Sequence, residues 1–189
     1  METDSKIILG IDPGTLQMGY GIVLINGSQL SYVQMEVLSL SPKLNPYDRL
    51  SLIFKKVKLL IKTHKATEFA IEAPFFGKNV QSMLKLGRAQ GVAIAAAIES
   101  GLPVVEYSPR KVKQSITGNG NSDKTQVWKM LQQILKLPPQ DDPKTYDATD
   151  ALAVAVCHYF QLRTPSLGGS KKFTGWDDFI KNNPKKVGK

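Results

Sequence analysis

Short apolar runs alternate with turn residues in the first part of the chain. Residues 6–12, 19–25 and 29–38 are rich in apolar side chains, and Pro13-Gly14 and Asn26-Gly27 separate them. Runs of this length between glycine, proline and asparagine are typical of strands, and an Asn-Gly pair between two of them favours a hairpin. The pattern predicts three strands in an antiparallel meander.

The spacing changes at Asn45-Pro46, where a segment with helical periodicity begins. Its apolar positions are Leu50, Ile53, Phe54, Val57, Leu60 and Ile61. Two later apolar runs, 68–72 and 103–107, are predicted as strands. Helices are predicted over residues 79–100, 124–135 and 145–162. A meander followed by alternating strands and helices predicts an α/β protein, with a mixed five-stranded sheet and helices on both faces.

The size and composition of the chain fit one domain that needs no disulfide. Its 189 residues are 42% hydrophobic, and its one cysteine, Cys157, falls inside an apolar run, which is typical of a reduced, packed thiol. The N-terminus is acidic and polar, unlike a secretory signal, and no apolar run has the length of a membrane span. We therefore expect a soluble, cytoplasmic protein without a membrane partner.

Charge favours a polyanionic partner. The formal net charge is +9 and the sequence pI is about 9.6, which promotes binding to nucleic acid through the release of counterions. Residues 163–189 carry seven Lys or Arg against two Asp, a net charge of +5. We expect residues 1–163 to form the folded domain and residues 164–189 to form a basic, flexible tail.

Four carboxylates stand at the ends of apolar segments. Asp12 ends the first predicted strand and Glu72 ends the fourth. Asp147 and Asp150 lie three residues apart near the start of the last predicted helix, so they share one face. Helix capping needs only one of them. Clusters of oxygen ligands suit hard cations such as Mg²⁺, and two such ions can hold the attacking and leaving oxygens of a phosphate displacement. A nuclease is therefore the first hypothesis.

Other segments suit contacts with phosphates and bases. We interpret residues 10–15, which are followed by Gly19-Tyr20-Gly21, as an acid at the mouth of the sheet beside a glycine-bearing turn that a phosphate can approach closely. Residues 111–124 interleave lysines with a glycine-rich turn, which predicts a solvated loop able to bind phosphates. Of the adjacent Phe75 and Phe76, one ring is expected in the core and the other beside a base. His64 and His158 are not expected to be ligands.

Together these blocks resemble the RuvC family, the bacterial Holliday-junction resolvases. The similarity runs in order over about residues 6 to 162. It lies in Gly10-Ile11-Asp12-Pro13-Gly14, Ala70-Ile71-Glu72, Lys78-Asn79, residues 84–93, Val112-Lys113-Gln114, residues 123–127, residues 135–138 and residues 147–153. The resemblance implies a ribonuclease-H-like fold and a structure-selective endonuclease that acts in DNA recombination and repair.

The resemblance also implies roles for individual residues. Asp12, Glu72, Asp147 and Asp150 match the catalytic tetrad, which would bind Mg²⁺ or Mn²⁺ with two ions per active site. Phe75 matches an aromatic residue near the exchange point of the junction, and Lys113 and Lys124 match basic residues near the scissile phosphate. The other residues expected to contact DNA are Phe76, Lys78 and Lys111. Pro74 departs from the family pattern, and Phe76 leaves open which ring is the wedge.

The implied assembly is a homodimer whose interface uses the helix around residues 87–98. Two active sites would then nick strands of like polarity symmetrically and leave 5′-phosphate and 3′-hydroxyl ends that ligase can seal. The branch-migration proteins RuvA and RuvB are the implied partners. Two alternatives remain: a junction-binding protein without catalysis, and an ATPase like actin or Hsp70, suggested by the loop at Asp12. The retained acids argue against the first, and the short chain, without a second lobe, argues against the second.

Overall fold

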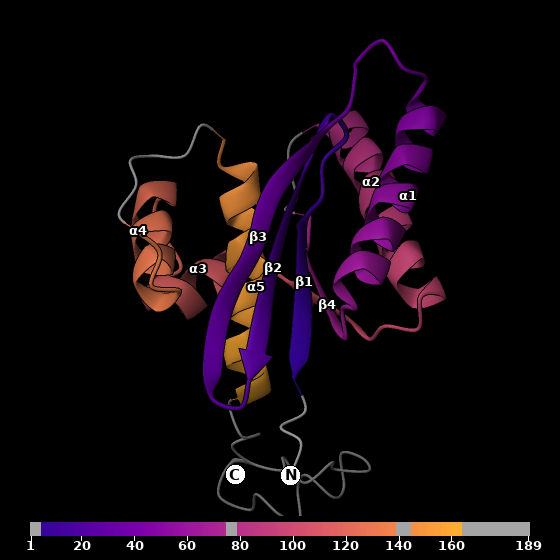
Figure 1. The fold of residues 1–189 in the computed structure, drawn as a ribbon. Coiled ribbons are helices and arrows are strands. Elements are labelled where there is room, and N and C mark those ends of the chain that lie inside the picture. Colours follow the sequence, from indigo (N-terminus) through magenta and orange to yellow (C-terminus); the bar gives the residue numbers. More distant parts are fainter. Residues whose placement is uncertain (1–4, 75–78, 139–144, 164–189) are drawn as a thin grey trace, which may run out of the picture.

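The computed structural model describes residues 5–74, 79–138 and 145–163. They form a five-stranded sheet in the order β3-β2-β1-β4-β5 (Figure 1). The strands are β1 (Lys6–Asp12), β2 (Gln17–Asn26), β3 (Gln29–Ser39), β4 (Glu68–Glu72) and β5 (Val104–Tyr107). The first three strands pair antiparallel, whereas β1, β4 and β5 run parallel. The predicted mixed five-stranded sheet is therefore confirmed.

Helices cover both faces of this sheet, as the sequence predicted. One face carries α1 (Pro46–His64) and α2 (Val80–Glu99), and the other carries α3 (Pro109–Thr117), α4 (Lys124–Ile134) and α5 (Asp147–Arg163) (Figure 1). Each face has its own core, because successive residues of a strand point to opposite sides. On β1, Ile8 belongs to the core with α5, whereas Leu9 and Ile11 belong to the core with α1 and α2.

Helix α1 follows the local signals read in the sequence. The side chain of Asn45 accepts a hydrogen bond from the backbone N–H of Tyr47, and Pro46 occupies the first turn, where its missing N–H costs nothing. The helix ends at Lys65, which adopts a left-handed conformation with φ of 53°. Its buried residues are Ile53, Val57, Leu60 and Ile61, which are four of the six predicted apolar positions.

Three glycines allow α5 to lie directly on the sheet. A Cβ atom at Gly10 would overlap the carbonyl oxygen of Ala151, and one at Gly21 would overlap the Cα atom of Leu152. A Cβ atom at Gly19 would overlap the carbonyl oxygen of Asp147. Gly19 and Gly21 lie within β2, in agreement with the strand predicted over residues 19–25, and both face the α5 backbone.

The prediction of a solvated loop at residues 111–124 is wrong for the first half of this segment. Residues 109–117 form α3, which opens with the Ser108 side chain accepting from the N–H of Lys111 and ends at Gly118, with φ of 78°. Val112 and Ile116, one helical turn apart, are its buried residues. Only the turn after Gly118 keeps the predicted character, and it leads to the cap of α4 at Asp123.

No helix in the part of the chain that the structure describes is long and apolar enough to cross a membrane. The free thiol of Cys157 is buried on α5, as expected for a packed cysteine. His158 is also buried, and its Nδ1 lies 2.8 Å from the Tyr107 hydroxyl while its Nε2 lies 3.5 Å from a Glu68 carboxylate oxygen. These contacts tie α5 to β4 and β5 and give His158 a structural role.

Candidate active site

The sheet and α5 bring the predicted acids to one edge. Because β1 and β4 are parallel neighbours with Ile11 opposite Ile71, Asp12 and Glu72 follow at the same end of the sheet. Helix α5 begins at this end with Asp147 and Asp150 in its first turn, where carboxylates also interact favourably with the helix dipole. The glycine contacts of α5 fix the distance of its first turn from β1 and β2.

Three of these acids form a group that could hold a metal ion. Asp12, Asp147 and Asp150 each offer a carboxylate oxygen, and these oxygens lie within 4.8 Å of one another. All three side chains are partly buried. Glu72 is not in this close group, but it lines a cavity of about 250 Å³ together with Asp12 and Asp150. An oxygen-only donor set, half-shielded from water, fits a hard divalent cation.

Burial and mutual repulsion raise the pKa values of two of the acids. Burial raises the pKa of Asp12 from 3.8 to about 8, and the charges of Glu72, Asp150 and Asp147 add to this rise. Burial and the charge of Asp150 raise the pKa of Glu72 from 4.5 to about 7. Carboxylates in such an environment hold protons unless a cation compensates their charge. A divalent ion would therefore displace protons when it binds.

Two lysines border the acids. The Nζ of Lys124 lies 2.7 Å from Oδ2 of Asp150, and Lys113 lines the same cavity as Glu72. Burial lowers the pKa of Lys124, but its hydrogen bond to Asp150 and the surrounding carboxylates outweigh this effect and leave the pKa raised. Lys124 is therefore a fixed cation at the edge of the acidic group.

The remaining predicted DNA contacts are placed differently. Lys111 is exposed on α3 but is not among the described residues that line the cavity with Lys113 and Lys124. Phe75, Phe76 and Lys78 lie outside the described residues. The structure thus joins two of the four predicted lysines to the acids.

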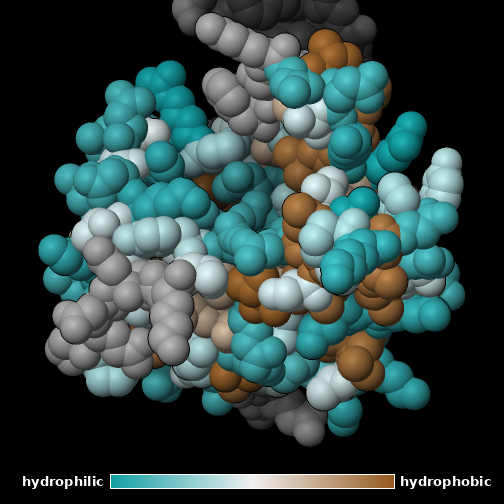
Figure 2. Space-filling view, turned by 90° about the horizontal axis from the view of Figure 1, so that it is seen from above, coloured by the Kyte–Doolittle hydropathy of each residue, from teal (hydrophilic) through white to brown (hydrophobic). Residues whose placement is uncertain are grey.

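Figure 2 looks onto the end of the molecule at which the acids lie. Hydrophilic side chains cover much of this end, and hydrophobic ones gather mainly over α1 and α2. Sequence reasoning missed Arg49, Lys85 and Arg88, which line a pocket beside the β1–β2 turn. Arg49 lies on α1, and Lys85 and Arg88 lie on α2. The sequence could have indicated only that Lys85 and Arg88, three residues apart, lie on the same face of one helix.

Comparison with known proteins decides the family. The family model described as crossover junction endodeoxyribonuclease RuvC matches residues 8–158. This chain belongs to the RuvC family. RuvC of Cytophaga hutchinsonii is 56% identical over 187 residues, which cover 98% of this chain and 90% of the relative. RuvC of Porphyromonas gingivalis is 50% identical and covers 99% of this chain and 100% of the relative. The predicted family is confirmed.

A solved RuvC structure supports the same fold. T. thermophilus RuvC in complex with a Holliday junction substrate is 33% identical, with a TM-score of 0.77, and the match covers 84% of this chain and 95% of that chain. The ribonuclease-H-like fold and the class of enzyme, a crossover junction endodeoxyribonuclease, are therefore confirmed for this RuvC family member. The catalytic assignment of the individual residues stays a prediction.

Proposed function

We propose that Asp12, Glu72, Asp147 and Asp150 form the catalytic centre with which this RuvC family member cleaves four-way DNA junctions. The observation that carries the proposal is the convergence of three carboxylates within 4.8 Å, with Glu72 beside them, in a chain of this family. The donor set suits Mg²⁺ or Mn²⁺, and we propose two ions per active site. Bound there, the metal would activate water and stabilise the leaving oxygen.

The protein's own side chains would prepare the site for this chemistry. The four acids would hold the cation, and Asp12 and Glu72 would give up their protons when it binds. Lys124 partly neutralises Asp150, and Lys113 faces the same cavity. The two lysines are thus placed to bind oxygens of the scissile phosphate next to the acids.

Contacts farther along the DNA rest on the resemblance. Phe75 or Phe76 would insert at the exchange point of the junction, and Lys78 would bind phosphate nearby. Lys111, exposed on α3, would bind the DNA backbone away from the reacting atoms. A basic chain with net charge +9 would draw in the junction electrostatically.

A homodimer through α2 would explain paired cleavage. Val80, Leu84 and Ile98 on this helix are 68%, 55% and 62% exposed, and Cβ atoms added at Gly87 and Gly91 would meet nothing within 4 Å. An open apolar and small-residue stripe suits a second copy of the helix. Two related sites would then nick strands of like polarity and leave ligatable 5′-phosphate and 3′-hydroxyl ends. The resemblance supports RuvA and RuvB as partners, and the single, packed cysteine supports a cytoplasmic location.

The test is cleavage of a synthetic four-way junction and of a linear duplex of the same sequence, with Mg²⁺ and at matched salt. The wild type should make paired symmetric nicks in the junction alone. Asp147→Asn should lose at least about 10³-fold in rate, since metal binding contributes several kcal/mol to such reactions. Asp48→Asn, the same change on α1 outside the acidic group, is the control and should cleave like the wild type.

Two outcomes would contradict this proposal. Cleavage by Asp147→Asn at the rate of the wild type would remove the acids from the mechanism. Tight binding of the junction by the wild type without cleavage, with either metal and several junction sequences, would favour the noncatalytic junction-binding protein instead.

A further inference from the structure

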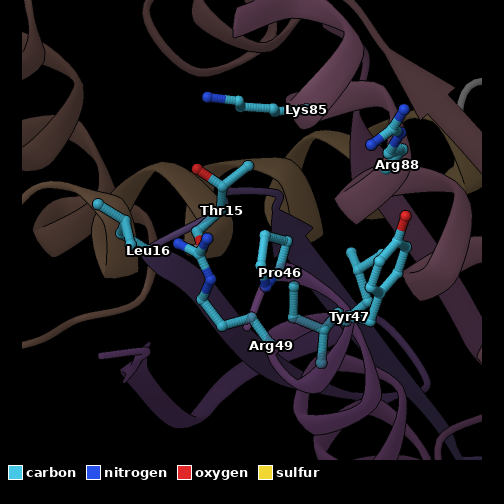
Figure 3. Close-up of a pocket in the computed structure, with 9 residues that line it drawn as sticks. Thr15, Leu16, Pro46, Tyr47, Arg49, Lys85 and Arg88 are labelled. Atoms are coloured by element: carbon cyan, nitrogen blue, oxygen red, sulfur yellow. The ribbon is translucent and has the colours of Figure 1, made fainter. Parts of the chain in front are cut away.

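A second pocket opens on the other side of the β1–β2 turn from α5. It has a volume of about 260 Å³ and lies between Thr15 and Leu16 of that turn, the start of α1, and α2. Arg49 reaches into it from α1, and Lys85 and Arg88 reach in from α2 (Figure 3). We call it the basic pocket, after these three cations.

No carboxylate among the described residues balances the charges of the basic pocket. None of the nine residues that line it is acidic. Among the described residues, the ion pairs of Lys or Arg with carboxylates join Lys6 to Glu68, Lys58 to Glu99 and Lys124 to Asp150, so none involves the pocket. Three cations around one cavity repel one another, and a bound anion would relieve this repulsion.

Arg49 adds a second observation that points to an anion. Its Nε is buried without a hydrogen-bond partner, the single such side-chain atom in the described part of the protein. Its Nη1 lies 3.5 Å from the carbonyl oxygen of Thr15, which is a long contact. Arg49 as a whole is only partly buried, but an unsatisfied buried atom is costly and calls for an explanation, such as a ligand that its guanidinium binds during function.

The basic pocket adjoins the acidic site. Leu16 lines the basic pocket and also the cavity that contains Asp12 and Asp147. A DNA strand whose scissile phosphate lies at the acids can therefore continue over the β1–β2 turn. We propose that the basic pocket binds a backbone phosphate of that same strand, away from the reacting bond. This inference rests on the proposed junction cleavage and assigns the direction in which the strand leaves the active site.

The chemistry of the pocket fits a phosphodiester. Guanidinium groups donate hydrogen bonds in a planar fork that matches two phosphate oxygens, and Arg49 and Arg88 both offer this geometry. The apolar wall formed by Leu16 and Pro46 suits the face of a deoxyribose. Tyr47 at the rim is 71% exposed and leaves the entrance open to a macromolecule.

The experiment measures junction binding in EDTA, where metal-assisted cleavage cannot occur, over a range of salt concentrations. A double variant, Lys85→Gln with Arg88→Gln, removes two exposed cations of the basic pocket without disturbing the core. The slope of log affinity against log salt should fall in magnitude by about 0.9 for each phosphate that the variant no longer neutralises. The control is Lys55→Gln with Lys62→Gln, two exposed lysines of α1 outside the pocket, whose slope should match the wild type.

Equal slopes for the pocket variant, the control and the wild type would overturn the assignment. Arg49→Lys serves as a further variant, because it keeps the charge but loses the planar pair of N–H donors. If Arg49 binds the phosphate, this variant should bind the junction more weakly than the wild type. Thermal protection by inorganic phosphate that disappears in the pocket variant, together with an unchanged DNA slope, would assign the pocket to a free anion and overturn the DNA assignment. If the wild type does not cleave the junction with Mg²⁺, the proposed function is contradicted. That result is separate from the test of the basic pocket, because the salt dependence of binding is measured without catalysis.

Discussion

The two faces of the sheet are built differently. On one face, α5 contacts β1 and β2 backbone to backbone through Gly10, Gly19 and Gly21, and most of its residues are buried. On the other face, α1 packs mainly through larger aliphatic side chains and α2 mainly through alanines, and α2 leaves apolar residues such as Leu84 and Ile98 exposed. The close face fixes the acids, and the open face leaves apolar and basic side chains exposed, which we propose bind a second copy and DNA.

Under the proposed function, the two faces serve different purposes. A carboxylate cluster binds a cation only if its oxygens keep their separation, so the helix that carries Asp147 and Asp150 must not shift relative to Asp12. Because glycine has no side chain, the backbones of β1 and β2 are in direct contact with the backbone of α5. An interface between two proteins tolerates side-chain rearrangement on binding, but it needs a large exposed surface that the partner can cover.

The largest effect should come from filling the close contact. Gly19→Ala places a Cβ atom against the carbonyl oxygen of Asp147, so α5 must move. We expect the free energy of unfolding to fall by about 1–3 kcal/mol, as for other overpacked positions. Junction cleavage should fall by about 10²-fold, since a displacement near 1 Å can cost this much. Urea unfolding and a cleavage assay measure the two effects.

Gly91→Ala on α2 is the matched control for the stability of a single chain, measured at a protein concentration too low for dimers, because within one chain its Cβ atom would meet nothing within 4 Å. Within a helix, alanine is favoured over glycine by about 0.5–1 kcal/mol, so this variant should be at least as stable as the wild type. Equal losses of stability in the two variants would contradict the contrast between the faces.

The next effect concerns the charge held at the close face. Asp12→Asn should stabilise the metal-free protein, because it removes a carboxylate whose pKa is raised from 3.8 to about 8 by burial and by Glu72, Asp150 and Asp147. Each pKa unit corresponds to about 1.4 kcal/mol, and after discounting for partial solvent access we expect a gain of about 2 kcal/mol at pH 8. Urea unfolding in EDTA measures it.

The gain should shrink toward pH 4, where wild-type Asp12 is protonated in the folded state and the unfolded state also begins to take up its proton. A gain that is the same at both pH values would mean that the charge of Asp12 is not its cause. Cleavage by this variant should be lost at every pH, because a ligand of the proposed metal site is missing.

The wild type should show the corresponding pH dependence. Between pH 6.5 and 8 the unfolded chain has already released the protons of Asp12 and Glu72, whose pKa values in the folded protein are about 8 and 7. The folded state then binds more protons, so the free energy of unfolding should fall as pH rises, by about 1–2 kcal/mol after the same discount. Urea unfolding in EDTA at several pH values tests this.

His158 does not mask this trend. Burial lowers the pKa of His158 below the ordinary histidine value of 6.5. The contribution of His158 to the free energy of unfolding therefore rises with pH only up to about pH 6.5. Added Mg²⁺ should reverse the fall above pH 7, because it binds the deprotonated acids, and at a hundred times its dissociation constant it would add about 2.7 kcal/mol. A stability that rises through this range without metal would contradict the raised pKa values.

The comparison of the faces also explains what could be predicted from the sequence. Strands and long helices follow from the periodicity of apolar residues, and the edge at which Asp12 and Glu72 lie follows from two strands that end in acids. Helix α3 was missed because only Val112 and Ile116 are buried among nine residues, which leaves little periodicity to detect. The strand containing Gly19 and Gly21 was predicted, but their contact with α5 was not, because a strand glycine that a helix packs against has no distinctive pattern in the sequence.

The basic pocket could not be predicted for a different reason. Arg49 stands far from Lys85 and Arg88 in the sequence, and only the packing of α1 on α2 places them around one cavity. Lysines and arginines on helices usually indicate solvated faces. The pocket is distinguished by the lack of carboxylate partners within residues 5–74, 79–138 and 145–163, and this can be seen only in three dimensions.

The smallest effect on folding should come from the open face. Leu84→Ala removes a side chain that is 55% exposed on α2, so the free energy of unfolding of one chain should change by less than about 0.5 kcal/mol. If α2 forms the dimer interface, the same change should raise the dimer dissociation constant about tenfold or more, as truncation of a buried interface residue costs above about 1 kcal/mol. Sedimentation over a range of concentrations measures the dissociation constant.

Leu59→Ala is a closely matched control, since Leu59 is 56% exposed on α1 and lies outside the α2 stripe. It loses the same atoms from an equally exposed position, so it should leave both stability and dimerisation as in the wild type. If the two variants dimerise equally well, α2 is not the interface, and paired cleavage would need another arrangement of two active sites. If Leu84→Ala alone dissociates, its junction nicks should become uncoupled, because each site would then act as a separate monomer.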